Sequence, residues 1–161
     1  MLNKLAPHSR VWVFQANRFL SKDDEHKINS ELSKFIPQWA SHRNEIYGDF
    51  SIEKSLFILV GADEKKSPTS GCSIDSLTRV IKKLGEDLKI NFFDRLTLSY
   101  VDSENKIQLL SMPEFKALMK KDQIKISTMV FNNLIETKED LDTRWYTQVK
   151  NSWHKNLIDI L

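Results

Sequence analysis

The chain has 161 residues, of which 40% are hydrophobic and 29% charged, a composition typical of globular rather than disordered proteins. We expect one domain, residues 1–161, with its core in residues 9–111 and a C-terminal helical extension in residues 112–161. The longest apolar run, Leu56–Val60, is far shorter than the roughly 20 residues of a membrane helix. The amino terminus lacks the apolar core of a signal peptide, so we expect a cytoplasmic protein with no membrane partner.

Lys and Arg number 24 against 22 Asp and Glu, and the net charge of +2 is spread evenly along the chain. Nucleic-acid-binding proteins concentrate positive charge because phosphate neutralisation supplies most of their affinity, so we expect no nucleic-acid partner. The single cysteine, Cys72, excludes an internal disulfide and a cysteine-based metal cluster. His26, His42 and His154 have no partners at metal-ligand spacing, and we expect neither a metal nor another cofactor.

The first strand is predicted at Arg10–Ala16, which is rich in β-branched and aromatic residues. Ser21 and Asp24 then form a capping box, with the shorter acid at its third position, and open a helix. Two further strands, Ile46–Ile52 and Leu56–Val60, follow as a tightly joined pair.

A second helix opens at Cys72, with apolar residues spaced alternately three and four apart. Gly85 costs that helix about 1 kcal/mol relative to alanine, so we expect it to fray or to end early. Next, Leu96–Val101 and Ile107–Leu110 are predicted to form a hairpin.

The remainder of the chain is predicted to be helical. Ser111 and Glu114 form a capping box that opens a short helix. Thr137 caps a last helix. The apolar stripe of this last helix is Leu141, Trp145, Val149 and Trp153.

The first six elements match the βαββαβ order of the ferredoxin-like fold, whose first and third strands are central and antiparallel. Arg10–Ala16 and Leu56–Val60 are apolar on both faces, whereas Ile46–Ile52 and Leu96–Val101 are apolar on one. We therefore predict an α+β fold, a ferredoxin-like antiparallel sheet with one added strand. Its second face should be covered by the C-terminal helices or by a second copy of the chain in a homodimer.

Cys72 is the first candidate for chemistry, because an anion is favoured at the amino end of a helix and a thiol there is activated. Since the third strand ends where the antiparallel first strand begins, His8 and Arg10 should lie nearby. These residues suggest a thiol-dependent enzyme or redox sensor, with Cys72 as nucleophile, His8 as base and Arg10 as anion anchor. The alternatives are a small buried cysteine that packs a loop and a plain surface histidine.

The same helix end is also a candidate anion site, since backbone amides there can hold a phosphate or carboxylate. Asp75 is equally a first-turn partner of the helix dipole, and Arg79 is equally an exposed side chain. The candidate ligand-binding residues are Arg10, Gly71, Ser73, Asp75, Ser76 and Arg79. Elsewhere, Asn132 and Asn133 are expected to hydrogen-bond loop backbone rather than to line a pocket.

Five segments together resemble a family of small uncharacterised bacterial proteins that are often labelled "ABC transporter ATPase". They are Ser9–Trp12, Gly71–Ser76, Phe92–Arg95, Phe131–Leu134 and Ser152–Trp153, so the resemblance covers nearly the whole chain. The family has no established activity, and the resemblance implies no catalytic role for any residue. None of the four glycines begins the G-x-x-x-x-G-K-[ST] pattern of a phosphate-binding loop, so we expect no ATPase activity and interpret the label as a misannotation.

Two classes of function remain open. The favoured one is a non-enzymatic module that binds a small molecule or a protein partner, because no complete catalytic constellation is visible. The alternative is the Cys72-dependent enzyme or redox sensor with His8 as base.

Overall fold

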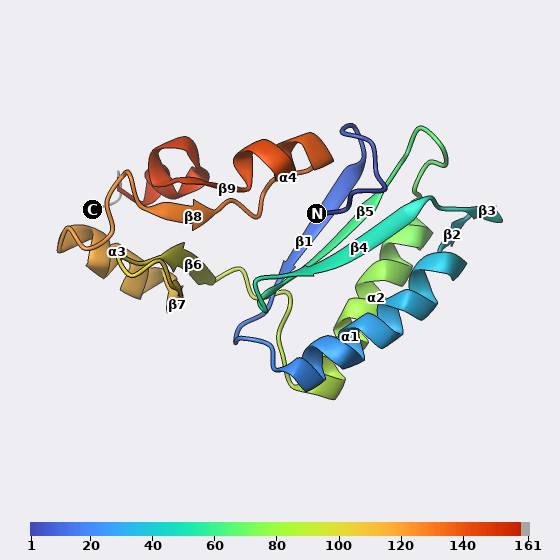
Figure 1. Ribbon diagram of the computed structural model, residues 1–161, viewed down its shortest axis with the longest axis horizontal. Helices are drawn as coiled ribbons and strands as arrows, with labels where there is room; N and C mark the ends of the chain where they lie inside the picture. The colour runs from blue at the N-terminus through green and yellow to red at the C-terminus, as the bar shows by residue number, and fades with distance from the viewer. Residues whose placement is uncertain (159–161) are drawn as a thin grey trace.

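The computed structural model describes residues 1–158, which form an α+β structure around a three-stranded and a four-stranded antiparallel sheet (Figure 1). The first sheet has the order β1-β5-β4, with β1 (Arg10–Gln15), β4 (Gly48–Glu53) and β5 (Phe57–Ala62). The second has the order β7-β6-β8-β9, with β6 (Thr97–Val101), β7 (Ile107–Ser111), β8 (Met129–Phe131) and β9 (Tyr146–Gln148). A separate short pair consists of β2 (Ala40–Ser41) and β3 (Asn44–Glu45).

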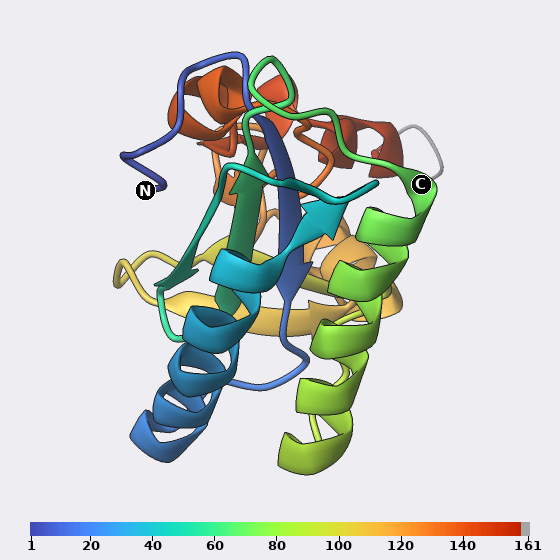
Figure 2. The same ribbon diagram turned by 90° about the vertical axis from the view of Figure 1, so that its right-hand side faces the viewer.

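The long helices lie together beside the first sheet (Figure 2). They are α1 (Lys22–Phe35) and α2 (Gly71–Leu88). The shorter helices are α3 (Met112–Lys120), which packs on the second sheet, and α4 (Lys138–Arg144), which contacts β1 and β9. Three 3₁₀ turns complete the described chain, η1 (Ile36–Gln38), η2 (Val149–Asn151) and η3 (Trp153–Leu157). Within residues 1–158, no helix combines the length and the apolar character needed to cross a membrane.

Serine side chains begin the first three helices. Ser21 and Ser111 cap α1 and α3 through the predicted capping boxes. In α2 the cap is Ser70 rather than Cys72: its Oγ accepts a hydrogen bond from the Ser73 N–H, and Ser73 Oγ accepts one from the Ser70 N–H. The helix therefore starts one residue earlier than predicted, at Gly71.

The predicted pairing of the first and third strands is confirmed, since Trp12 lies opposite Val60 in an antiparallel register. The ferredoxin-like arrangement is not confirmed, because β6 does not pair with β1. A strand has only two edges, and β6 uses one for β7, with Thr97 opposite Ser111, and the other for β8. As a result, β5 is the central strand of the first sheet and β1 lies at its edge.

The prediction of a wholly helical extension in residues 112–161 is wrong for its middle part, which contributes β8 and β9 to the second sheet. The last helix ends at Arg144, so the predicted apolar stripe is not one helix face. Instead, the ring of Trp145 packs 4.9 Å from that of Phe57 and 5.1 Å from that of Phe131. This aromatic contact joins the C-terminal part of the chain to the first sheet.

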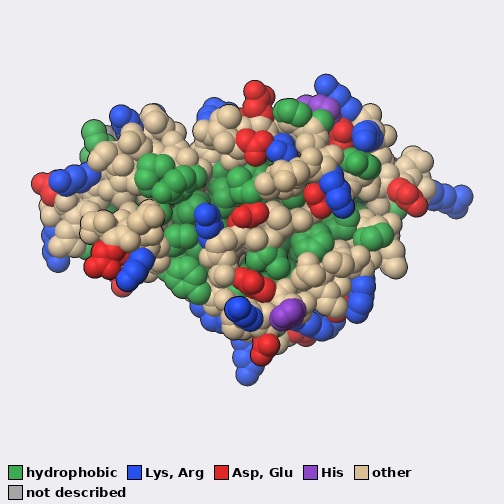
Figure 3. Space-filling model, viewed as in Figure 1, with side chains coloured by type: hydrophobic (Ala, Val, Ile, Leu, Met, Phe, Trp, Pro, Cys, Tyr) green, Lys and Arg blue, Asp and Glu red, His purple; other side chains and the backbone are tan. Residues whose placement is uncertain are grey.

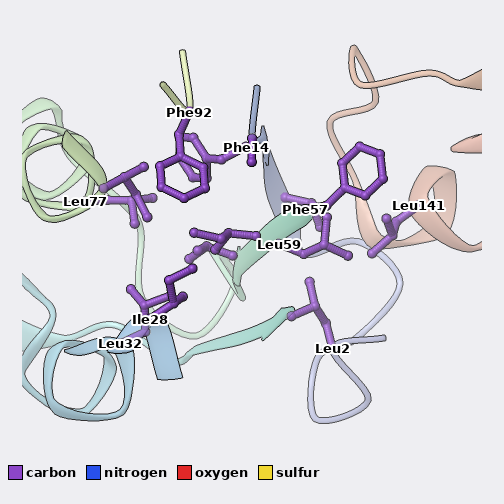
Figure 4. Close-up of a cluster of buried hydrophobic side chains, with 14 of the residues drawn as sticks. Leu2, Phe14, Ile28, Leu32, Phe57, Leu59, Leu77, Phe92 and Leu141 are labelled. Carbon is purple, nitrogen blue, oxygen red and sulfur yellow. The ribbon is translucent and has the colours of Figure 1, made fainter. Parts of the chain in front are cut away.

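Both faces of the first sheet are covered, as expected. Figure 4 shows Phe14 close to Leu77 of α2 and to Phe92. It also shows Phe57 beside Leu141 of α4. A separate core cluster lies under the second sheet and contains Leu98, Phe115, Met119, Ile124, Val130, Val149 and Leu157. The helices α1 and α2 thus cover one face, while the segments after β7 help to cover the other.

Gly85 does not end α2, which continues to Leu88 and closes on Lys89 in the left-handed conformation, with a φ of 55°. A Cβ at position 85 would lie 2.5 Å from the carbonyl oxygen of Ile90. The Ile90 N–H in turn donates to the Gly85 carbonyl at 2.9 Å. The missing side chain therefore allows the chain to return against the helix, a role that helix propensity does not reveal.

Candidate functional site: a groove along the edge of β1

A groove of about 870 Å³ follows the free edge of β1, and we call it the β1 groove. Its lining includes all six residues of β1, Leu77 and Thr78 of α2, the segments Phe92–Arg95 and Asn133–Thr137, and the pair Trp153 and His154. The edge strand thus lies between two walls. One wall is built by α2 and by the segment Phe92–Arg95, and the other by the segment Asn133–Thr137, which follows β8.

The direction of the β1 main-chain groups follows from hydrogen bonds at both ends of the strand. The Ala16 N–H donates to the carbonyl of Leu56, the residue just before β5. Because main-chain groups alternate in direction along a strand, the even-numbered residues of β1 also point their N–H and carbonyl groups toward β5. The Val11 N–H donates to the Glu136 carbonyl at 2.9 Å, on the other side. Odd-numbered residues of β1 therefore point their main-chain groups into the groove.

Within the described residues, only the first part of this edge is paired. The Lys138 N–H donates to Ser9 and the Val11 N–H to Glu136, which makes one antiparallel bridge between Arg10 and Thr137. Beyond it the two segments separate. Among residues 1–158, no hydrogen bond is made by the Val11 carbonyl or by the main-chain groups of Val13 and Gln15 that face the groove.

Large apolar side chains with exposed surface stand on both walls. Phe93 is 40% exposed and packs edge-on against Phe14, with ring centroids 5.6 Å apart. On the opposite wall, Leu134 is 63% exposed. Near one end of the groove, the Arg10 guanidinium lies 4.8 Å from the centre of the Trp12 ring. The middle of the groove is therefore largely apolar.

A partly buried network of amide, hydroxyl and indole groups forms the inner wall. Gln15 Oε1 accepts hydrogen bonds from Ser99 Oγ at 2.9 Å and from Asn133 Nδ2 at 3.0 Å. Asn133 Oδ1 accepts one from the Trp145 indole N–H at 3.0 Å. The expectation for Asn133 is therefore wrong, because its side chain binds other side chains and lines the groove. Asn132 behaves as expected, since its Oδ1 accepts from the Leu134 backbone N–H at 3.3 Å.

His154 lines the groove from the C-terminal side. Its Nδ1 is 2.7 Å from Ser152 Oγ, its ring stacks on Trp153 at 4.1 Å, and it is only 1% exposed. Burial lowers the pKa of His154 to about 4. The ring is therefore neutral at pH 7.

His8 lies at the end of β5, as the strand pairing predicts, but its hydrogen-bond partner is Asp63. The distance from His8 Nε2 to Asp63 Oδ1 is 2.7 Å, and this bond holds the pKa of Asp63 below its usual value. Cys72 is exposed, so the alternative of a buried, loop-packing cysteine is wrong. Within residues 1–158, no hydrogen bond joins the thiol to His8, and the nucleophile–base pair stays a prediction.

The other predicted ligand residues lie on the first turns of α2, outside the groove. Ser73 is buried in the capping box, and Ser76 Oγ donates to the Cys72 carbonyl. Gly71, Asp75 and Arg79 are exposed. Of the residues that the sequence singled out near the thiol, only His8 and Arg10 line the β1 groove.

Sequence reasoning missed the residues that define the groove. The side chains of Phe93 and Leu134 look like core residues in the sequence, and their exposure depends on tertiary structure. Among the described residues, no group of three His, Cys, Asp or Glu side chains is placed to hold a metal ion.

Comparisons with protein-family models, with curated proteins and with solved structures find no match to this chain. The β1 groove is therefore the feature on which a functional proposal rests.

Proposed function

We propose that the protein is a cytoplasmic, non-enzymatic binding module and that the β1 groove is its binding site. The main support is the combination of unpaired main-chain groups with exposed apolar side chains in one groove. A volume of about 870 Å³ lies within the roughly 300–1,000 Å³ of ligand-binding clefts. Such clefts are mostly apolar with a few polar groups, and this combination is present here.

The charges around the groove favour an occupant without a large net charge. Arg10 lies 3.7 Å from Glu64, and His8 is paired with Asp63. Figure 3 shows acidic and basic side chains interspersed over the drawn face of the molecule, with no broad basic area on that face. This pattern supports a small molecule or protein segment over nucleic acid as the partner.

The test uses three small probes, 8-anilinonaphthalene-1-sulfonate, N-acetyl-tryptophanamide and N-acetyl-leucinamide, followed by ¹H–¹⁵N spectra. We expect at least one probe to shift the amide signals of Val13, Phe93 and Leu134. Leu134→Ser should weaken its binding about fivefold, because apolar contact is lost. Leu96→Ser is the matched control, since Leu96 is 67% exposed but does not line the groove. Equal effects of both substitutions, or unshifted groove signals with every probe, would contradict the proposal.

The thiol-dependent function stays a hypothesis with one supporting feature, the exposure of Cys72 on the first turn of α2. A homodimer likewise stays a prediction.

A further inference from the structure

We propose that the β1 groove binds an extended peptide segment of a partner protein, which adds to the first sheet as a strand beside β1. This inference rests on the proposed binding function and names the class of ligand. The free edge of β1 is the observation that specifies it.

The unpaired N–H and carbonyl groups along the β1 edge are arranged as in a strand that lacks its neighbour, so the main chain of an extended peptide can pair with them. The Val11 carbonyl, the Val13 N–H and carbonyl, and the Gln15 N–H face the groove in sequence, so acceptors and donors alternate. An extended peptide carries the same alternation at the same repeat, because each strand residue advances about 3.3 Å. A small molecule rarely carries donors and acceptors at this spacing, whereas an added strand hydrogen-bonds to every one of these main-chain groups.

The chain itself already begins this ladder. The segment Glu136–Lys138 pairs with the first part of β1 through the bridge between Arg10 and Thr137 and then separates from the strand. The Val11 N–H donates to the Glu136 carbonyl, but among the described residues the reciprocal bond from the Glu136 N–H is not made. A ligand strand would continue the pairing from that point toward Gln15.

Folded proteins protect exposed edge strands with lysine, proline or bulges. β1 has none of these, since its six residues are RVWVFQ and its register with β5 is unbroken. Its edge is instead recessed between two walls that include the exposed side chains of Phe93 and Leu134. These walls offer apolar contact to the alternating side chains of a bound strand. The charged residues that line the groove are of both signs, with Arg10 3.7 Å from Glu64 and with Arg95 and Glu136 in addition, so they favour a segment without a large net charge.

A second copy of this chain is a poorer occupant of the same edge. Paired strands lie about 4.8 Å apart, and two β1 edges that both lie at the floor of a groove cannot approach so closely. A single extended segment of a flexible partner carries no such walls and avoids this conflict.

The first experiment selects ligands from a phage-displayed library of random linear 12-residue peptides and measures their affinity by fluorescence polarisation. The selected peptide is then N-methylated at one position at a time, which removes single amide N–H groups. We expect losses of about tenfold at alternate positions and little effect between them, because only every second amide faces β1. Binding should also slow the hydrogen exchange of the Val13 and Gln15 amides.

A pair of protein variants provides the second measurement. Val13→Pro removes an N–H that faces the groove and leaves the β1–β5 hydrogen bonds intact, so peptide affinity should fall about tenfold. Ile52→Pro is the matched control, because Ile52 lies on β4, and by the alternation of the β4–β5 ladder its N–H points away from β5 at the opposite edge of the same sheet. Circular dichroism checks that both variants fold. The N-methyl series keeps the test valid if either does not.

Each other outcome has a definite meaning. Peptides that bind without the alternating pattern and without protection of Val13 and Gln15 overturn strand addition. Small probes that occupy the groove when the library yields no peptide also overturn it but leave the binding function standing. Concentration-dependent protection of the same amides, with a dimer in sedimentation equilibrium, would assign the edge to a second copy. If neither probes nor peptides affect the groove, the binding function fails too.

Discussion

The imidazole of His154 makes stability depend on pH in a predictable direction. Burial lowers its pKa from 6.5 to about 4 in the folded protein. Between pH 4 and pH 6.5, His154 is therefore protonated in the unfolded chain but neutral in the folded protein. The contribution of His154 to stability is therefore fully present above pH 6.5 and is lost as the pH falls toward 4.

We expect the free energy of unfolding to fall by about 2 kcal/mol between pH 7 and pH 5 through this group alone. Urea unfolding at both pH values measures it in the wild type and in His154→Gln, which removes the titrating ring. The pH-dependent loss should shrink by that amount in the variant. His26→Gln, at an exposed position on α1, is the control and should keep the wild-type difference. Identical pH profiles for the wild type and His154→Gln would show that burial of this ring is not responsible.

The thiol hypothesis is decided by one comparison at the residue scale. If His8 activates Cys72, removing His8 should slow the alkylation of the thiol. The hydrogen bond between His8 and Asp63 instead favours a structural role for the imidazole. We expect iodoacetamide to modify Cys72 at rates within about twofold in the wild type and in His8→Ala, because no proton transfer to His8 is involved. A tenfold slower reaction in His8→Ala would revive the thiol-dependent enzyme.

Among the elements, α2 shows how a close contact overrides helix propensity. Gly85→Ala should destabilise the protein by about 1–3 kcal/mol although alanine is the better helix former, because its Cβ would meet the Ile90 backbone. Gly71→Ala, in the first turn of the same helix, meets no atom within 4 Å and should be neutral or slightly stabilising. Chemical denaturation of the two variants measures the difference. A Gly85→Ala protein as stable as Gly71→Ala would contradict this account of the helix end.

The strand β1 illustrates the limit of side-chain patterns for sheet order. Its two apolar faces predicted a central position, but it is an edge strand. The pattern reports burial of the two faces, which α2 on one side and the aromatic cluster around Phe57 on the other do provide. It carries no information about the two edges, where only main-chain groups interact. Edge occupancy therefore has to come from the tertiary structure.

For the whole molecule, the question is whether the two core clusters unfold together. Phe57 and Phe115 are both fully buried, one in each cluster. We expect a single cooperative unfolding transition. Phe57→Leu and Phe115→Leu should each lower the free energy of unfolding of the whole protein by roughly 1–2 kcal/mol. Urea unfolding followed by near- and far-ultraviolet circular dichroism measures both. Two separate transitions, with Phe115→Leu moving only one, would overturn the expectation of a single domain.

The sequence by itself determined the local structure, because the signals for it lie within a few residues of one another. The capping serines Ser21 and Ser111 and the hairpin β6–β7 could be predicted from such signals. The antiparallel pairing of β1 with β5 could also be predicted, but from the order of the elements and the two apolar faces of both strands. The mixed α+β class follows from the same signals. Periodicity, caps and turn residues act over one or two turns of chain, so the amino-acid order is enough to read them.

The tertiary structure alone decided the full strand order of the two sheets and where the candidate site lies. β6 pairs with β7 and β8 instead of β1, and β8 and β9 were not predicted. The β1 groove depends on the exposure of Phe93 and Leu134 and on unpaired main-chain groups, which every residue type carries alike. These features arise when distant segments compete for one edge and one core, and that competition is settled by packing across the whole fold.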